Sequence, residues 1–170
     1  MSTSANLPEP WLRGPIDGVD PLIAPVLRSY QQAVEDLTLH SEDLTTEQIW
    51  SRPSDLAPLG FQLHHIAGSV DRLTTYLRGE ALTDSQIAFL KAEMDPGSSC
   101  EELLGLIRAS LSASEAHIRT IDPAALREPR FIGKKRLPTT VAGLLLHLAE
   151  HTQRHVGQAI SAAKLARVTG

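Results

Sequence analysis

The 170-residue chain has little of several residue types, and each shortage excludes a class of protein. Cys100 is the only cysteine, so no internal disulfide can form and a reducing cytoplasm is the expected compartment. Aromatic residues make up only 4% of the sequence, and β-branched residues are outnumbered by leucine and alanine. This composition favours helices packed on helices over β-sheets.

The chain also lacks the features of membrane and nucleic-acid proteins. No apolar run approaches the roughly 20 residues of a membrane-spanning helix, and MSTSANLPEP at the start has no charged, hydrophobic leader. The net charge of −4 argues against a nucleic-acid surface, because binding phosphates needs an excess of Lys and Arg. The basic run Gly133–Arg136 is too local to change that balance, and we interpret it as a solvated loop. We therefore expect a cytoplasmic protein with no membrane or nucleic-acid partner.

Prolines and glycines divide the chain into an arm and a series of helical patterns. Residues 1–18 are rich in both and predict an extended N-terminal arm, which Trp11 could pin; residues 19–170 predict one bundle domain. In that domain, apolar residues recur every three or four positions in four long segments. The long helices are predicted at Asp20 to about His40, Leu59 to Arg78, Ser99 to about Ile121, and Thr140 to Lys164, with short helices at Leu44–Trp50 and after Thr83.

The connecting segments complete this prediction. In the short helix after Thr83, Ile87 and Leu90 are expected to face inward. The stretch Arg127–Pro138 is polar, with at most a little extended structure around Phe131-Ile132. No strand-period alternation of useful length and no internal repeat is present. We therefore predict an all-α protein, a four-helix bundle with short extra helices and an extended N-terminal arm.

Three histidines follow one another at intervals of four residues in the last helix: His147, His151 and His155. Positions four apart lie on one helix face, offset by about 40°. His151 and His155 share their stripe with leucines and alanines, which places them toward the core. A buried imidazole needs partners for its ring nitrogens, and a metal ion would serve both rings. We therefore predict that His151 and His155 are metal ligands.

The third ligand must come from another helix. The turns from His147 to His155 span about 12 Å of rise, whereas histidine–metal bonds are about 2.0–2.1 Å, so we interpret His147 as a packing or ligand-orienting residue. On the second long helix, periodicity separates His64 and His65 only weakly. A surface position explains His117, and the helix dipole explains His40 at the end of the first helix.

A family resemblance adds to these observations. The run His151-Thr-Gln-Arg-His155-Val-Gly157-Gln158 resembles the C-terminal signature of the DinB-like (DinB/YfiT) superfamily, in which Gly-Gln closely follows a His-x-x-x-His pair. The segment from Phe61 to Ser69, followed by Asp-Arg-Leu, resembles the stretch that supplies the third histidine. The resemblance covers nearly the whole chain and implies a four-helix bundle with a three-histidine metal site, open to water or substrate. Carried over residue by residue, it implies His65, His151 and His155 as ligands.

The resemblance implies a range of functions. Some family members are similar in using a metal to activate a thiol cofactor for transfer or isomerisation, and others are described only as metal-dependent hydrolases. For this chain it implies a divalent metal, with zinc or nickel ahead of iron, cobalt or manganese, because three imidazoles do not select one metal. It also implies a low-molecular-weight thiol, a small-molecule substrate and a homodimer. The alternative is a non-catalytic metal-binding or stress-associated module.

Four further residues are functional candidates. Glu150, Ser69 and Gln158 could orient the ligating rings, and Gln158 is the best placed of them on the inner edge of its helix, whereas Glu150 could equally be a solvated surface residue. Cys100 lies in the first turn of a long helix, whose dipole could lower the thiol pKa, although an incidental, partly buried cysteine is the simpler interpretation. No phosphate loop, nucleophile elbow or dinucleotide fingerprint identifies a substrate.

Overall fold

The computed structural model describes residues 7–52 and 56–169, and these residues are mostly helical, which confirms the all-α prediction. The α-helices are α1 (Ala24–Ser41), α2 (Thr46–Trp50), α3 (Leu59–Leu77), α4 (Asp84–Ala92), α5 (Cys100–Ile118) and α6 (Val141–Thr169). Two 3-10 helices, η1 (Pro10–Leu12) and η3 (Pro123–Arg127), and two strands, β1 (Pro129–Ile132) and β2 (Leu137–Thr140), complete the described structure.

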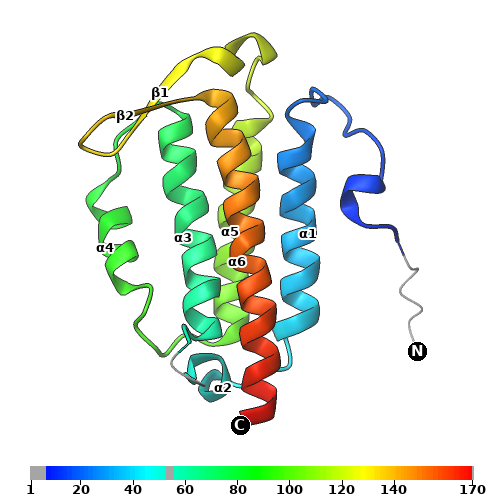
Figure 1. The fold of residues 1–170 in the computed structure, drawn as a ribbon, viewed down its shortest axis with the longest axis vertical. Coiled ribbons are helices and arrows are strands. Elements are labelled where there is room, and N and C mark those ends of the chain that lie inside the picture. The colour runs from blue at the N-terminus through cyan, green and yellow to red at the C-terminus, as the bar shows by residue number, and fades with distance from the viewer. Residues whose placement is uncertain (1–6, 53–55, 170) are drawn as a thin grey trace.

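The four long helices form the bundle, with α6 packed against both α3 and α1 (Figure 1). α5 lies behind α6 and packs against α3, so the apolar stripes of all four helices meet in one core. Leu63 and Ile66 of α3, Ile107 of α5 and Leu148 of α6 are almost completely buried there. Full burial of such a side chain stabilises a fold by about 1.5–3 kcal/mol. This shared core holds α3 and α6 side by side along their length.

Side-chain caps begin several helices where the sequence predicts. Capping boxes start α2, α4 and α5, formed by Thr45 with Gln48, Thr83 with Gln86, and Ser99 with Glu102. Thr140 Oγ1 accepts a hydrogen bond of 3.0 Å from the backbone N–H of Gly143 at the start of α6. Each bond satisfies an N–H group that has no partner inside its helix.

Two predictions about apolar positions are wrong. α1 begins at Ala24 instead of Asp20, because the Asp20 carboxylate accepts from the N–H of Leu22 and closes a separate turn. Leu22 consequently lies outside the helix and is 74% exposed. On α4, Leu90 is exposed and Phe89 packs toward α3, since this short helix contacts the bundle along only one edge.

The N-terminal arm lies beside α1, and the prediction that Trp11 pins it is wrong. The first six residues of the predicted arm lie outside the described residues. The ring of Trp11 is mostly exposed, and its N–H donates to the neighbouring Glu9. Exposed tryptophan cannot anchor a segment by burial, so other contacts must hold the arm.

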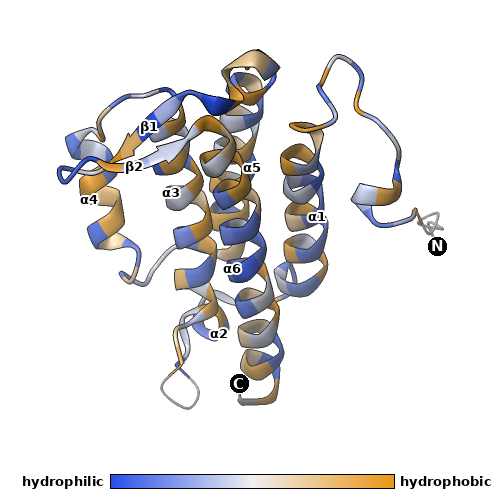
Figure 2. Cartoon of the chain, turned by 45° about the horizontal axis from the view of Figure 1, so that its top comes forward, coloured by the Kyte–Doolittle hydropathy of each residue, from blue (hydrophilic) through white to orange (hydrophobic). Residues whose placement is uncertain are grey.

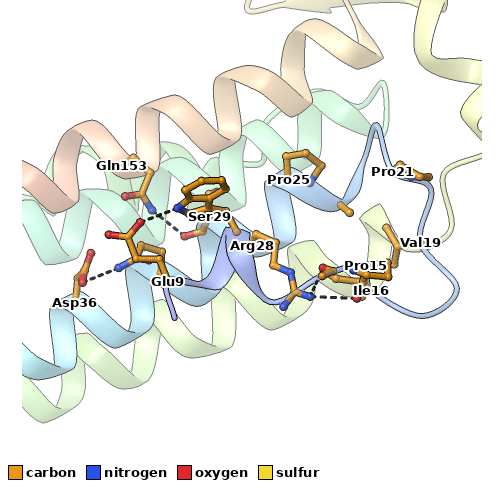
Figure 3. A pocket seen from close by; sticks show the side chains of 14 residues that line it. Glu9, Pro15, Ile16, Val19, Pro21, Pro25, Arg28, Ser29, Asp36 and Gln153 are labelled. Atoms are coloured by element: carbon orange, nitrogen blue, oxygen red, sulfur yellow. Dashed lines mark hydrogen bonds between the residues drawn. The ribbon is translucent and has the colours of Figure 1, made fainter. Parts of the chain in front are cut away.

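Two arginines tie the arm to α1. Arg13 forms an ion pair of 2.6 Å with Glu35, and Arg28 Nη2 donates to the carbonyl oxygens of Gly14 (2.7 Å) and Pro15 (3.1 Å). Figure 3 shows the contact of Arg28 with the arm at the edge of a cavity of about 890 Å³. Ile16 of the arm also packs against the hydrophobic core, so polar bonds and an apolar contact together hold the arm.

A short hairpin crosses the end of the bundle where α3 ends and α4 begins (Figure 1). Pro129 of β1 pairs with Thr140 of β2, and Ile132 pairs with Leu137. The structure confirms the extended segment near Ile132, but its pairing was not predicted, because strands of four residues show too little alternation. In the described part of the chain, no helix is both long enough and apolar enough to cross a bilayer.

Candidate metal centre

Three histidines converge where α3 and α6 pack together. His65 comes from α3, and His151 and His155 lie one turn apart on the facing side of α6. Each offers a ring nitrogen, and the three nitrogens lie within 4.8 Å of one another. His65 Nε2 is 3.1 Å from His151 Nε2, and the ring centroids of His65 and His155 are 4.3 Å apart. We call these three residues the triad.

The spacing of the triad fits a shared metal ion. With histidine–metal bonds of about 2.0–2.1 Å, two nitrogens on one ion lie about 3.0–3.4 Å apart. The observed 3.1 Å between His65 and His151 lies inside that range. All three rings are half-buried, so a bound ion would be partly shielded from water yet open on one side. Among the described residues, the triad could therefore hold a metal ion.

Hydrogen bonds at the far side of two rings set which nitrogen faces the centre. Glu93 Oε2 accepts from His65 Nδ1 at 2.7 Å, and Gln62 Oε1 accepts from His155 Nδ1 at 2.8 Å. A neutral imidazole that donates from Nδ1 has its lone pair on Nε2. The two acceptors thus direct the Nε2 lone pairs of His65 and His155 into the centre, as outer partners of metal-binding histidines do.

Glu93 is itself held by a buried ion pair. It directly follows α4, is 3% exposed, and its second oxygen accepts from Arg72 Nη1 at 2.7 Å. Burial opposes ionisation of Glu93, but hydrogen bonds from His65 and Arg72 outweigh it and lower the pKa of the carboxyl. Glu93 therefore places a fixed negative charge behind His65.

A glycine makes room for this ion pair. A Cβ atom on Gly68 would lie 2.7 Å from both Glu93 Oε1 and Arg72 Nη1, and 2.6 Å from the Phe89 ring. Real Cβ contacts are longer, so a larger residue would displace the ion pair from α3. The support of His65 by Glu93 consequently depends on Gly68.

Burial lowers the pKa of two triad histidines. The pKa of His151 and that of His155 each fall to about 4, first because burial disfavours the charged ring and then because the His65 ring close to both makes a further charge there unfavourable. Both rings are thus neutral near pH 7, and neutral imidazole is the form that binds metals. Unlike its neighbours, His151 has a buried Nδ1 without a hydrogen-bond partner in the described structure.

The structure separates His65 from its neighbour His64. The His64 ring packs edge-on against Phe89 of α4, with centroids 4.4 Å apart, and therefore lies away from α6. Its Nδ1 is buried and has no hydrogen-bond partner among the described residues. Of the two candidates that periodicity could not distinguish, only His65 reaches His151 and His155.

His147 belongs to a different cluster that sequence reasoning missed. It lies one turn before His151, and its Nδ1 is 2.6 Å from Glu150 Oε1. These three residues also bring donor atoms within 4.8 Å of one another. The second Glu150 oxygen, however, pairs with Arg154 at 2.5 Å, which neutralises the carboxylate and places a positive charge beside it. That charge would repel a metal ion, so the triad is the better candidate.

The residues that orient the rings are not those expected from the sequence. Gln158 is exposed, Ser69 donates to the carbonyl of Ile66, and Glu150 contacts His147 and Arg154. Gln62 could have been found, because it lies three residues before His65 on the same helix face. Glu93 carried no such signal, since it is 28 residues from His65 in the chain.

Cys100 and the two remaining histidines lie apart from the triad. Cys100 is buried, its thiol donates to the carbonyl of Ser41 at 3.1 Å, and burial raises its pKa. The thiol is more deeply buried than the expected partly buried cysteine, and the alternative of a lowered pKa is wrong. His40 lies in the last turn of α1, where a cation suits the helix dipole. His117 lies in the last turn of α5, where burial and the nearby Arg78 lower its pKa.

Comparison with known proteins identifies one family for most of the chain. A family model described as the DinB superfamily matches residues 29–159, from α1 into α6. The matched region contains the whole triad together with Gln62, Arg72 and Glu93. No curated protein matches the chain. The family match covers well over half of the sequence, with the candidate metal centre inside it.

Proposed function

The chain belongs to the DinB superfamily, and on that premise we propose that His65, His151 and His155 bind a divalent metal ion. The observation that carries this proposal is the convergence of three half-buried histidine nitrogens, two of them directed inward by hydrogen bonds to Glu93 and Gln62. Zinc or nickel suits three imidazoles well, and iron, cobalt or manganese would also bind such a set.

We further propose that the protein is an enzyme acting on a small molecule, of the thiol-dependent transferase or hydrolase type. A divalent ion bound by three side chains supplies a Lewis acid with coordination positions open for a substrate group. The described cluster contains three donors, which agrees with an open site. The chain's own residues would hold the ion: Glu93 and Gln62 orient two rings, and Glu93 would strengthen His65 as a ligand.

If the reaction uses a thiol, that thiol comes from a separate small molecule. Cys100 is buried, its pKa is raised by burial, and its hydrogen bond to Ser41 ties it to the end of α1. A reactive thiol must be accessible and readily ionised, and Cys100 is neither. A low-molecular-weight thiol is therefore the second cofactor in this proposal.

Metal content and turnover of one variant test both parts. Protein purified without an affinity tag should contain about one equivalent of metal, as expected for one triad. The substitution His151→Ala should reduce that content at least tenfold and remove any activity found in a panel of thiol-transfer and hydrolysis reactions. The matched control is His64→Ala, which removes a nearby histidine outside the triad. Full metal content in the His151 variant would refute the site.

One observation favours a second function, a metal-binding module without catalysis. The cavities of about 890 Å³ beside the arm and about 630 Å³ beneath the hairpin are lined by residues other than the triad. Gln153 of α6 borders the first cavity and donates to the carbonyl of Ser29 on α1, so it lies on another face of α6 (Figure 3). A metal-loaded protein that turns over nothing in the same panel would favour this function over the enzyme.

A further inference from the structure

Positive charge gathers around a cavity at the hairpin end of the bundle, away from the triad. The cavity measures about 630 Å³ and lies between the hairpin, the end of α3 and the start of α4. Four cationic residues line it, Arg78, Arg130, Lys134 and Arg136, against a single acid, Glu80. Figure 2 shows the hydrophilic turn between β1 and β2, whose residues form part of the cavity lining. In a chain with a net charge of −4, this concentration of cations is local and unusual.

Most of this charge is not neutralised by the protein. Arg130 pairs with Glu128 at 3.2 Å. No ion pair is found for Arg78, Lys134 or Arg136 in the described part of the chain. Like charges gathered around one cavity repel each other, and a bound anion would remove that repulsion.

The end of α3 does not account for these cations either. Its last carbonyl groups could attract positive side chains, but they are already occupied. The backbone N–H groups of Gly79 and Glu80 donate to two of them, and Arg130 Nε donates to the carbonyl of Leu77 at 2.8 Å. Arg130 thus fastens the hairpin to α3, and the other three cations remain available to a ligand.

The walls of the cavity also contain two aromatic rings, Tyr76 and Phe131. The guanidinium carbon of Arg136 lies 4.3 Å from the centre of the Phe131 ring, which holds the cation by a cation–π contact. Stacking on the ring leaves the N–H groups at the edge of the guanidinium free to bind an anion.

The backbone of Arg136 gives a second indication. Its φ of 49° is the one positive value found for a non-glycine residue in the described chain. That conformation is strained for arginine, whereas glycine or asparagine would adopt it readily in the same turn. Backbone conformations of this kind cluster at functional sites, which agrees with a role for Arg136 in binding.

We propose that this cavity binds a small phosphate monoester that carries an aromatic ring. The phosphate would lie among Arg78, Lys134 and Arg136, since arginines bind its oxygens in pairs, and the ring would lie against Tyr76 or Phe131. Tyr76 is eleven residues beyond His65, about 16 Å along α3, so the site is distinct from the triad. It depends neither on the metal nor on the proposed reaction.

Calorimetric titration with phenyl phosphate tests this proposal on the full chain. Saturable binding is expected, and the double substitution Arg78→Gln with Lys134→Gln should weaken it at least tenfold. Arg130 is left intact because it holds the hairpin. The control is Lys91→Gln with Lys164→Gln, which changes the net charge equally at exposed positions and should bind as the unaltered protein does.

The choice of ligand separates the parts of the proposal. Phenyl phosphate should bind more tightly than each of three simpler compounds. Inorganic phosphate lacks the ring, benzoate carries only one charge, and phenol carries none. Absence of saturable binding, or equal weakening in the control, would overturn the site. Equal affinity for inorganic and phenyl phosphate would overturn the role of the ring. Circular dichroism and an unchanged metal content would show that the variants are folded.

Discussion

Two neighbouring clusters, the triad with its partner Glu93 and the group around His147 on α6, each pair a histidine with a carboxylate in different surroundings. In the triad, the His65 side chain is 17% exposed and its partner Glu93 is 3% exposed. In the cluster one turn away, the corresponding values are 45% for His147 and 40% for Glu150. Both histidines bond to a carboxylate at a similar distance, 2.7 Å and 2.6 Å. Burial therefore distinguishes a preorganised centre from a solvated surface pair, although the residue types are alike.

The largest expected effect comes from removing the buried carboxylate. Glu93→Ala leaves Arg72 buried and unpaired and frees His65 from its acceptor. We expect a loss of about 3–5 kcal/mol in the free energy of unfolding and a 10–100-fold weaker metal affinity. Urea unfolding and metal titration measure the two effects. Glu93→Gln retains an acceptor, so its stability and metal affinity should lie between those of Glu93→Ala and of the unaltered protein. Equal losses in both variants would show that hydrogen bonding is unimportant.

A smaller effect is expected when the space for the buried pair is filled. Gly68→Ala places a methyl group against Phe89, Arg72 and Glu93, and such overpacking costs about 1–3 kcal/mol of stability. Gly105→Ala on α5 is the matched control, because a Cβ there meets nothing within 4 Å. The control should gain about 0.5–1 kcal/mol from helix propensity. Thermal unfolding of both variants checks the prediction, and equal shifts would contradict the described packing.

The titration of His151 and His155 should appear as a pH dependence of the stability of the metal-free protein. The pKa values of His151 and His155 are about 4 in the fold, below the ordinary value of 6.5. Between these values the unfolded chain binds more protons, so stability is complete above about pH 6.5 and falls as the pH decreases toward 4. Unfolding measured from pH 7 to pH 5 should show this slope before most carboxylates titrate.

A double variant identifies the source of that slope. His151→Asn with His155→Asn removes both titrating rings and should flatten the dependence between pH 7 and pH 5. The same change at His147 and His40, which lie outside the triad, serves as the comparison. A slope that persists unchanged in the triad variant would assign the pH dependence to other groups.

The smallest effect is expected at the exposed cluster. Glu150→Ala removes a partly exposed carboxylate that pairs with His147 and Arg154 on the same helix. Exposed pairs on one helix contribute about 0.3–0.5 kcal/mol each, so the loss of both should change stability by no more than about 1 kcal/mol. Metal content should stay the same. A loss of metal in this variant would move the centre toward His147 and remove the distinction between the two clusters.

Much of the fold could be predicted because helices depend on local information. The period of the apolar residues located α3, α5 and α6, and the capping pair Ser99 and Glu102 marked the start of α5. The start of α1 was less predictable, since Asp20 caps a separate turn with the same local pattern as a helix. Short strands such as β1 show too few residues for a period to emerge.

The sequence by itself determined that His151 and His155 share one face of a helix, because their spacing matches one helical turn. The family signature further indicated His65 as their partner. Only the tertiary structure decided that His65 reaches them while His64 packs on Phe89, and that Glu93 and Gln62 orient the rings. The contacts of Glu93 and Gln62 join segments that are distant in the chain. The choice between His64 and His65 depends on a rotation of one residue about the helix axis. Periodicity carries no information about such contacts; packing of the whole bundle sets them.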